Sequence, residues 1–262
     1  MIHFYKYHGT GNDFIIIDAV KNQIPVLNTQ QIKHLCDRRF GIGADGIMIL
    51  KKHPPLHFEM DYYNSDGTGG TMCGNGGRCI AKLAYTLGYA PQEITFLASD
   101  GIHEAEICSN GIVDLKMNDV ENVIKEENGY SCYTGSPHLI VFVNDTDQIN
   151  VFDQGRIIRY SEKYKQEGIN INFIEIIDQF KIKIRTYERG VEDETFSCGT
   201  GSVASALTYA ELNQIHSGQI EVEVKGGQLS VVFVKKNQGF TNIRLKGPAE
   251  QVFEGTTNID EF

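Results

Sequence analysis

The hydrophobic positions of this chain alternate with polar ones through much of its length. Phe58, Met60 and Tyr62 occupy every second position, and the segment 182–186 repeats this spacing. A period of two is typical of half-buried antiparallel strands. The pattern therefore predicts a chain built mostly from strands.

Two segments instead follow the period of an α-helix. In the first, apolar residues fall at i, i+3, i+4 and i+7, at Ile80, Leu83, Ala84 and Leu87. Gly88 follows directly and is placed to end the helix. The second segment has the same kind of spacing, at Val203, Ala206, Leu207 and Ala210. One helix is thus expected in each half of the chain.

The first half of the sequence returns in the second half at a nearly constant offset. Cys198 follows Cys73 by 125 residues (198 − 73), and both stand before a glycine-rich turn. Three further landmarks recur in the same order at offsets of 124 to 126 residues: Gly9 with Gly135, Asn64 with Glu188, and Gly101 with Gly227. Four matches in one order indicate an internal duplication.

The duplication predicts two similar lobes in an α+β fold. We expect each lobe to be a mostly antiparallel sheet or barrel wrapped around a central helix, with the active site in the cleft between them. The expected lobes are 1–120 and 121–262, because the segment 117–133 is charged and lacks sustained periodicity. The final residues, about 249–262, are candidates to pack back onto the first lobe.

Composition and charge exclude several classes of protein. Acidic residues outnumber basic ones by 34 to 24, and this net charge of −10 disfavours a nucleic-acid partner. The chain shows neither a signal peptide nor an apolar run long enough to span a membrane, so a soluble, cytoplasmic protein is expected. Its six cysteines should then be reduced, and none forms a CxxC pair.

The two recurring cysteines are the best candidates for chemistry. Each enters a predicted helix through a glycine-rich turn, CGNG from Cys73 and CGTG from Cys198. A helix start offers unpaired N–H groups and the positive end of the helix dipole, which bind carboxylates and stabilise thiolates. Core packing is the expected role of the other four, Cys36, Cys79, Cys108 and Cys132.

Two such turns facing one cleft would place a sulfur on either face of a bound α-carbon. One thiolate could remove the α-proton while the opposite thiol delivers a proton to the other face. The N–H groups of the turns would stabilise the charge that develops on the carboxylate. This arrangement is suited to inversion of the configuration at that α-carbon.

At these motifs the sequence resembles diaminopimelate epimerases. The resemblance extends over essentially the whole chain, through YHGTGNDFIIID, RRFGIGADG, YYNSDG, MCGNGGRC, GSPH, GININF, ERG and ETFSCGTGS. The cysteine motifs alone also occur in proline racemases and hydroxyproline epimerases, whereas the full set is more specific. The resemblance implies a cofactor-independent, two-base conversion of LL-2,6-diaminopimelate to the meso form, which serves lysine and peptidoglycan synthesis.

The resemblance also implies roles for individual residues. Cys73 and Cys198 match the catalytic pair, and the positions that match substrate-binding residues are Asn12, Asn64, Gly74, Asn75, Asn170, Glu188, Arg189, Gly199 and Thr200. Arg189 is suited to a distal carboxylate. Ser136 and His138 are further candidates, with Ser136 standing where other members have Asn. Gly46 replaces a substrate-contacting Gln of some members and is left out of the site.

Other motifs are discounted and other functions stay open. GIGADG, from Gly41, fits a dinucleotide fingerprint, but a strand is expected after it rather than a helix, so no nicotinamide cofactor is expected. His53 and His57 flank two prolines and do not indicate a metal site. A racemase acting on proline or hydroxyproline, a cysteine hydrolase using His138, and a non-catalytic amino acid binding protein are the alternatives. A homodimer is left open.

Overall fold

A computed structural model describes residues 1–70, 72–237 and 239–259 of the chain. It separates into two compact units, the first formed by Met1–Leu115 with the residues from Pro248 onward and the second by Lys116–Gly247. Residues 116–120, expected in the first lobe, thus group with the second. The reason is hydrogen bonding, since the N–H groups of Met117 and Val120 donate to carbonyls of Ile243 and Phe240 in that unit.

The first unit contains eight strands and two helices among the described residues. The strands are β1 (Ile2–Gly9), β2 (Asn12–Asp18), β3 (Gly46–Lys51), β4 (Phe58–Asn64), β5 (Glu93–Ala98), β6 (Gly101–Ile107), β7 (Val113–Lys116) and β17 (Glu250–Thr257). The helices are α1 (Thr29–Cys36) and α2 (Gly74–Thr86).

The second unit repeats this set and adds one short strand and one 3-10 turn. Its strands are β8 (Val123–Glu126), β9 (Gly129–Tyr133), β10 (Pro137–Phe142), β11 (Asn170–Asp178), β12 (Lys181–Glu188), β13 (Asp193–Thr195), β14 (Ser217–Val224), β15 (Gly227–Lys236) and β16 (Gly239–Gly247). Its helices are η1 (Thr146–Gln148), α3 (Val151–Arg159) and α4 (Gly199–Leu212).

Strand pairing repeats step for step in the two units. The first unit runs β17, β1, β2, β3, β4, β5, β6, β7, with parallel pairing only at β2–β3 and β4–β5. The second runs β8, β9, β10, β11, β12, β14, β15, β16, with parallel pairing at the matching steps, β10–β11 and β12–β14. The expected duplicated α+β fold is confirmed, and its sheets are mostly antiparallel.

The outermost strand of each unit comes from the other repeat. β8 follows the first repeat along the chain but pairs with β9, whereas β17 follows the second repeat and pairs with β1. The first unit is therefore completed by a strand, β17, that lies outside its continuous segment 1–115, whereas β8 lies inside the continuous segment 116–247 of the second unit. The pairing of β17 with β1 depends on contacts that are distant in sequence.

The two predicted helices form the centres of their units. α4 contacts β8 to β12 and β14 to β16, and all of its residues from Gly201 to Ala210 are buried. α2 ends as expected, with Gly88 in the left-handed region at φ 74° and with the N–H of Tyr89 donating to the carbonyl of Ala84. The strands thus surround a helix whose first turn follows a cysteine.

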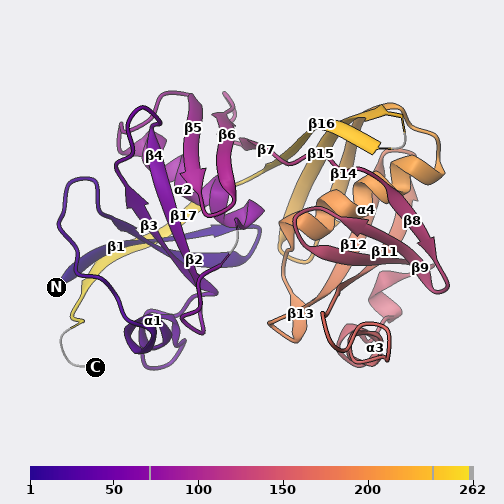
Figure 1. Ribbon diagram of the computed structural model, residues 1–262, viewed down its shortest axis with the longest axis horizontal. Helices are drawn as coiled ribbons and strands as arrows, with labels where there is room; N and C mark the ends of the chain where they lie inside the picture. Colours follow the sequence, from indigo (N-terminus) through magenta and orange to yellow (C-terminus); the bar gives the residue numbers. More distant parts are fainter. Residues whose placement is uncertain (71, 238, 260–262) are drawn as a thin grey trace. The chain divides into compact units, whose positions relative to one another are not determined.

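Two further helices were not predicted from the sequence. α1 packs Ile32 and Leu35 against the sheet of the first unit, and α3 packs Val151 against the second. In the second unit α3 and α4 lie on opposite faces of β11 and β12 (Figure 1). Both faces of β11 are therefore covered, and its first five residues, 170–174, are all buried.

Candidate active site

The first cysteine turn begins α2. The N–H of Gly77 donates to the Cys73 carbonyl at 2.7 Å as the first bond of the helix. The N–H groups of Gly74, Asn75 and Gly76 therefore have no acceptor within the helix and lie at its positive end. This turn has the backbone geometry of a carboxylate site.

The side-chain amides of Asn75 and Asn12 determine which atom lies next to the Cys73 sulfur. Arg78 Nη2 donates to Asn75 Oδ1 at 3.0 Å, and Asn75 Nδ2 donates to Asn12 Oδ1 at 3.1 Å. Asn12 Nδ2 in turn donates to Asp45 Oδ2 at 2.7 Å. The Cys73 thiol donates to Asn12 Oδ1 at 3.6 Å. Because Arg78 has only donors and a carboxylate accepts, both ends of this chain of bonds set the amide orientations.

Arg78 is a fully buried cation beneath the first turn. It also donates to the carbonyls of Gly74 at 3.3 Å and Pro248 at 3.5 Å. Burial lowers its pKa to about 10, so the guanidinium is charged at neutral pH. The equivalent position of the second repeat, 125 residues later (203 − 78), is Val203. This helix position therefore holds a cation in the first repeat and an apolar residue in the second.

A second charged group supports Asn12 from outside. Arg38 donates two bonds to Asp13, at 2.6 and 3.0 Å, and one to Asp45 at 2.7 Å. Although burial acts to raise it, hydrogen bonds from Arg38 and Lys6 lower the pKa of Asp13 to about 2. Burial and the charge of Asp13 raise the pKa of Asp45. Arg38 thus holds the Asp45 carboxylate next to the Asn12 amide.

The second cysteine turn begins α4 in the same way. The N–H of Ser202 donates to the Cys198 carbonyl at 2.9 Å, which leaves the N–H groups of Gly199, Thr200 and Gly201 without an acceptor inside the helix. A Cβ added to Gly201 would lie 3.3 Å from Cys198 Sγ, so the turn packs closely on its own cysteine.

Polar side chains lie behind Cys198. Its sulfur is 3.5 Å from Thr200 Oγ1, which is 3.0 Å from His138 Nε2. Asn172 Nδ2 contacts His138 Nδ1 at 3.1 Å, and Asn172 Oδ1 accepts from the Thr186 hydroxyl at 3.0 Å. Burial, with a smaller contribution from the charge of Arg189, lowers the pKa of His138 to about 3. The imidazole is therefore neutral at physiological pH.

Asn170 contacts two other predicted residues, Ser136 and Arg189. Its Nδ2 donates to Ser136 Oγ at 2.9 Å and to the Pro137 carbonyl at 3.1 Å, and its Oδ1 accepts from the Arg189 N–H at 2.9 Å. The guanidinium of Arg189 donates to the Glu167 carbonyl at 2.9 Å while the residue is exposed to solvent. Both amide hydrogens of Asn170 are thus used to position its neighbours.

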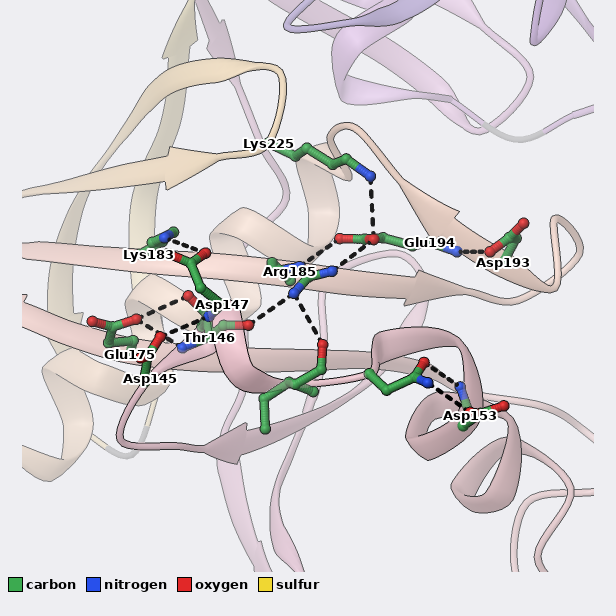
Figure 2. Close-up of polar contacts among 12 residues, drawn as sticks. Asp145, Thr146, Asp147, Asp153, Glu175, Lys183, Arg185, Asp193, Glu194 and Lys225 are labelled. Atoms are coloured by element: carbon green, nitrogen blue, oxygen red, sulfur yellow. Dashed lines mark hydrogen bonds and ion pairs between the residues drawn. The ribbon is translucent and has the colours of Figure 1, made fainter.

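Glu188 lies at the end of β12 and accepts from the Thr195 hydroxyl at 2.9 Å. Thr195 belongs to β13, the strand that leads to Cys198. Figure 2 shows how this strand is fixed, because Arg185 donates to both carboxylate oxygens of Glu194, at 2.7 and 2.9 Å, and Lys225 adds a third bond at 3.2 Å. Although burial opposes it, these bonds lower the pKa of Glu194.

The polar surface around Arg185 is not a competing ligand site. Lys183 pairs with Asp147 at 2.7 Å, and Arg185 and Lys225 both pair with Glu194 (Figure 2). Its cations are therefore neutralised by carboxylates of the same surface.

Asn64 and Gly46 face each other across β4 and β3. The Asn64 side chain donates to Thr68 Oγ1 at 3.2 Å, so it braces the turn that precedes Cys73. A Cβ added to Gly46 would lie 2.6 Å from a ring carbon of Tyr62 and 2.7 Å from the Tyr63 carbonyl oxygen. The Tyr62 ring thus occupies the space in which a longer residue at position 46 would begin.

The remaining cysteines and other candidate sites are less suited to chemistry. Burial raises the pKa values of Cys36 and Cys132 to about 12 and raises that of Cys79 further, while Cys108 is half-buried. Among the described residues no three metal-binding side chains cluster. No helix in the described part of the chain has the length and apolar character to cross a membrane.

Sequence interpretation missed the two residues that organise these networks, Arg78 and Asn172. A signal was present for the second, because Asn170 and Asn172 alternate with Ile171 and Phe173 and so share one face of a strand. Arg78 lies inside the MCGNGGRC motif. It was missed because a charged residue is rarely fully buried.

Comparison with known proteins identifies the family of the chain. The family model described as diaminopimelate epimerase matches residues 4–123 and 130–252. The chain belongs to the diaminopimelate epimerase family. It is 50% identical over 252 residues to the diaminopimelate epimerase of Flavobacterium psychrophilum, covering 96% of this chain and 98% of that one. The diaminopimelate epimerase of Chlorobaculum tepidum is 40% identical over 259 residues, covering 96% and 99%.

The fold of this family member is shared more widely. A crystal structure of a probable proline racemase from Agrobacterium radiobacter superposes with a TM-score of 0.72 at 15% identity, covering 100% of this chain and 94% of that chain. At that identity the likeness concerns the fold alone. Membership of an epimerase family makes the chain an isomerase.

Proposed function

We propose that this chain interconverts LL- and meso-2,6-diaminopimelate, with Cys73 and Cys198 as the two acid–base groups. The observation that carries this proposal is the recurrence of a cysteine as the residue that begins the central helix in both repeats. Membership of the diaminopimelate epimerase family supports the choice of substrate.

The reaction is a balanced exchange of one proton for another. One sulfur, as thiolate, removes the α-proton, and the electron pair of the broken C–H bond moves toward the carboxylate. The N–H groups of Gly74, Asn75, Gly199 and Thr200 stabilise that charge. The other sulfur, as thiol, then protonates the opposite face. The two sulfurs exchange protonation states, so the proposal requires both turns to meet one substrate.

The second amino acid end of the substrate requires its own contacts. Arg189 would bind the distal carboxylate, since its guanidinium is exposed and braced by the Glu167 carbonyl. Glu188 would accept from the distal ammonium. Asn12 and Asn64 complete the proposed contacts in the first unit, and Asn170, with Ser136, holds Arg189 in place. A monocarboxylate such as proline would leave Arg189 without its partner.

The product serves lysine and peptidoglycan synthesis in this proposal. The sequence leads us to expect that the reaction takes place in the cytoplasm and needs no cofactor. The chain would act as a monomer or as a homodimer. Cell fractionation and analytical ultracentrifugation of the purified chain would measure location and assembly.

The experiment incubates the purified chain with LL-diaminopimelate and follows the meso isomer by chiral chromatography, with no cofactor added. We expect approach to an equilibrium mixture from either isomer, and no reaction with L-proline. Racemisation of proline in place of diaminopimelate would favour the related racemase. Hydrolysis of a thioester or amide by the same sample, without isomerisation, would favour the hydrolase.

A further inference from the structure

The two repeats place different side chains at matching positions behind the two cysteines. In the first unit β2 pairs with β3 so that Ile16 faces Met48, and Met48 faces Tyr62 in β4. In the second unit the same registers place Ile140 opposite Asn172, and Asn172 opposite Thr186. The matching sets are therefore Phe14, Met48 and Tyr62 in the first repeat and His138, Asn172 and Thr186 in the second, and all six are buried except the half-buried Tyr62.

The polar set of the second repeat has one consistent hydrogen-bond direction. Asn172 Nδ2 also donates to the Leu139 carbonyl at 3.3 Å, and its Oδ1 accepts from Thr186, so the amide cannot be reversed. His138 Nδ1 must therefore accept, which puts the proton of the neutral ring on Nε2. That N–H donates to Thr200 Oγ1. The hydroxyl proton of Thr200 is then directed to Cys198.

In the first repeat the hydrogen bonds present an acceptor, rather than a donor, to the cysteine. The bonds from Arg78 through Asn75 to Asn12 present a carbonyl oxygen, Asn12 Oδ1, to Cys73. An oxygen acceptor at this position holds Cys73 as a donor and repels a thiolate. Phe14 and Met48 stand where the second repeat has His138 and Asn172, and they offer no hydroxyl or N–H.

We propose that in the ligand-free protein Cys198 is the thiolate and Cys73 is the thiol. Asn172 is a positioning residue in this arrangement, because it sets the tautomer of His138 and, through Thr200, the donor that faces Cys198. The inference rests on the proposed function for its catalytic meaning, since it states which sulfur is the base before a ligand binds.

Charged groups lie near both sulfurs. Both cysteines begin helices, so the helix dipole favours a thiolate equally at each. The buried Arg78 favours an anion at the first turn, but its donors are directed at three carbonyl oxygens rather than at the sulfur. Lys6 and Arg38 neutralise the carboxylates behind Asn12. In the second unit Arg189 acts electrostatically on His138, and Glu188 accepts from Thr195.

The test measures alkylation of each cysteine as a function of pH. The full-length, ligand-free protein is treated briefly with iodoacetamide between pH 5 and 10, and initial labelling of the two peptides is quantified by mass spectrometry. Each rate is divided by its own plateau at high pH, which removes the difference in exposure. We expect the midpoint of Cys198 to lie at least about one pH unit below that of Cys73, a tenfold difference in thiolate population.

Two pairs of variants separate hydrogen-bond direction from packing. Thr200→Val removes the donor and should raise the Cys198 midpoint by about one pH unit, while Thr200→Ser keeps the donor and should restore it. Asn172→Leu should raise the same midpoint, whereas Met48→Leu, a change at the matching position, should leave it unchanged. A structural role alone would not move the midpoint of one cysteine while sparing that of the other.

Two results would overturn the inference. One is a lower midpoint for Cys73 than for Cys198, and the other is an unchanged Cys198 midpoint in Thr200→Val. Both are distinguishable from failure of the proposed function, which is measured separately as conversion of diaminopimelate. Isomerisation with reversed midpoints would reject the protonation assignment alone, whereas the expected midpoints without isomerisation would reject the proposed reaction alone.

Discussion

The two repeats have matching strand registers but different chemistry beneath their cysteines. Both place a cysteine and a glycine turn at the start of a buried helix. Behind Cys73 lie Phe14 and Met48, whereas behind Cys198 lie His138 and Asn172, joined by hydrogen bonds. Backbone pairing tolerates such a change because the ladder uses main-chain groups only. Duplication thus supplies two equivalent helix starts, while buried side chains make them chemically distinct.

The largest effect is expected from the cysteines themselves. Cys73→Ala and Cys198→Ala should each lower kcat for isomerisation by about a thousandfold or more, because each removes one acid–base group. Cys79→Ala is the matched control, since the equivalent residue of the second repeat is already Ala204. It should keep kcat within a few-fold. Retention of activity in either of the first two variants would contradict the two-base mechanism.

Alanine at the third glycine-turn position after each cysteine should change the free energy of unfolding by different amounts in the two repeats. A Cβ on Gly201 would lie 2.4 Å from Asn172 Oδ1, whereas one on Gly76 would lie 3.1 Å from the flexible Met48 Sδ. Gly201→Ala should lower the free energy of unfolding by about 2 kcal/mol, because a fixed polar group must move. Gly76→Ala should be nearly neutral, since the helix gains about 0.5–1 kcal/mol. Urea denaturation measures both, and equal losses would show that the two turns have the same tolerance.

The buried histidine should make stability depend on pH. Because burial lowers the pKa of His138 to about 3, the unfolded chain binds more protons than the native one from there up to pH 6.5. The stabilisation is complete above pH 6.5 and is lost as the pH falls, by about 1.4 kcal/mol per unit. His138→Gln should remove this contribution from the slope of unfolding free energy between pH 6.5 and 4.5. An unchanged slope would mean that the imidazole titrates normally.

The smallest effect concerns the ends of the central helices. Gln214 adopts φ 55° at the position that Gly88 fills in the first repeat, 126 residues earlier (214 − 88). A residue with a Cβ is strained there, so Gln214→Gly should raise the free energy of unfolding by about 0.5–1 kcal/mol. Gly88→Gln should lower it by a similar amount. Thermal unfolding would measure both, and matching signs would contradict the equivalence of the two helix ends.

These comparisons show what local sequence can predict. Gly88 and the cysteine turns were found because their signals lie within a few residues of the structure they determine. α1 was missed because it has only a short apolar stripe, formed by Ile32, Leu35 and Cys36. The pairing of β17 with β1 joins residues about 250 apart, and no local pattern specifies it.

The site also contains residues that the sequence could predict and residues that it could not. The sequence and its family resemblance placed both cysteines and their glycine turns, which the structure describes as helix starts. They did not place Asn172, because its burial depends on partners far along the chain, His138 and Thr186. A buried polar residue is stabilised only by its assembled partners, so its role becomes visible once the strands are paired.

The central claim, inversion by two separate sulfurs, is tested most directly by one turnover in deuterated water. LL-diaminopimelate is incubated briefly with the protein, and deuterium at the α-carbon of each isomer is measured by mass spectrometry. The account predicts that the first meso product carries solvent deuterium while the unreacted LL isomer carries almost none, because the proton is delivered by a different group from the one that removed it. Equal deuterium in both isomers, or a product that retains the original proton, would contradict it.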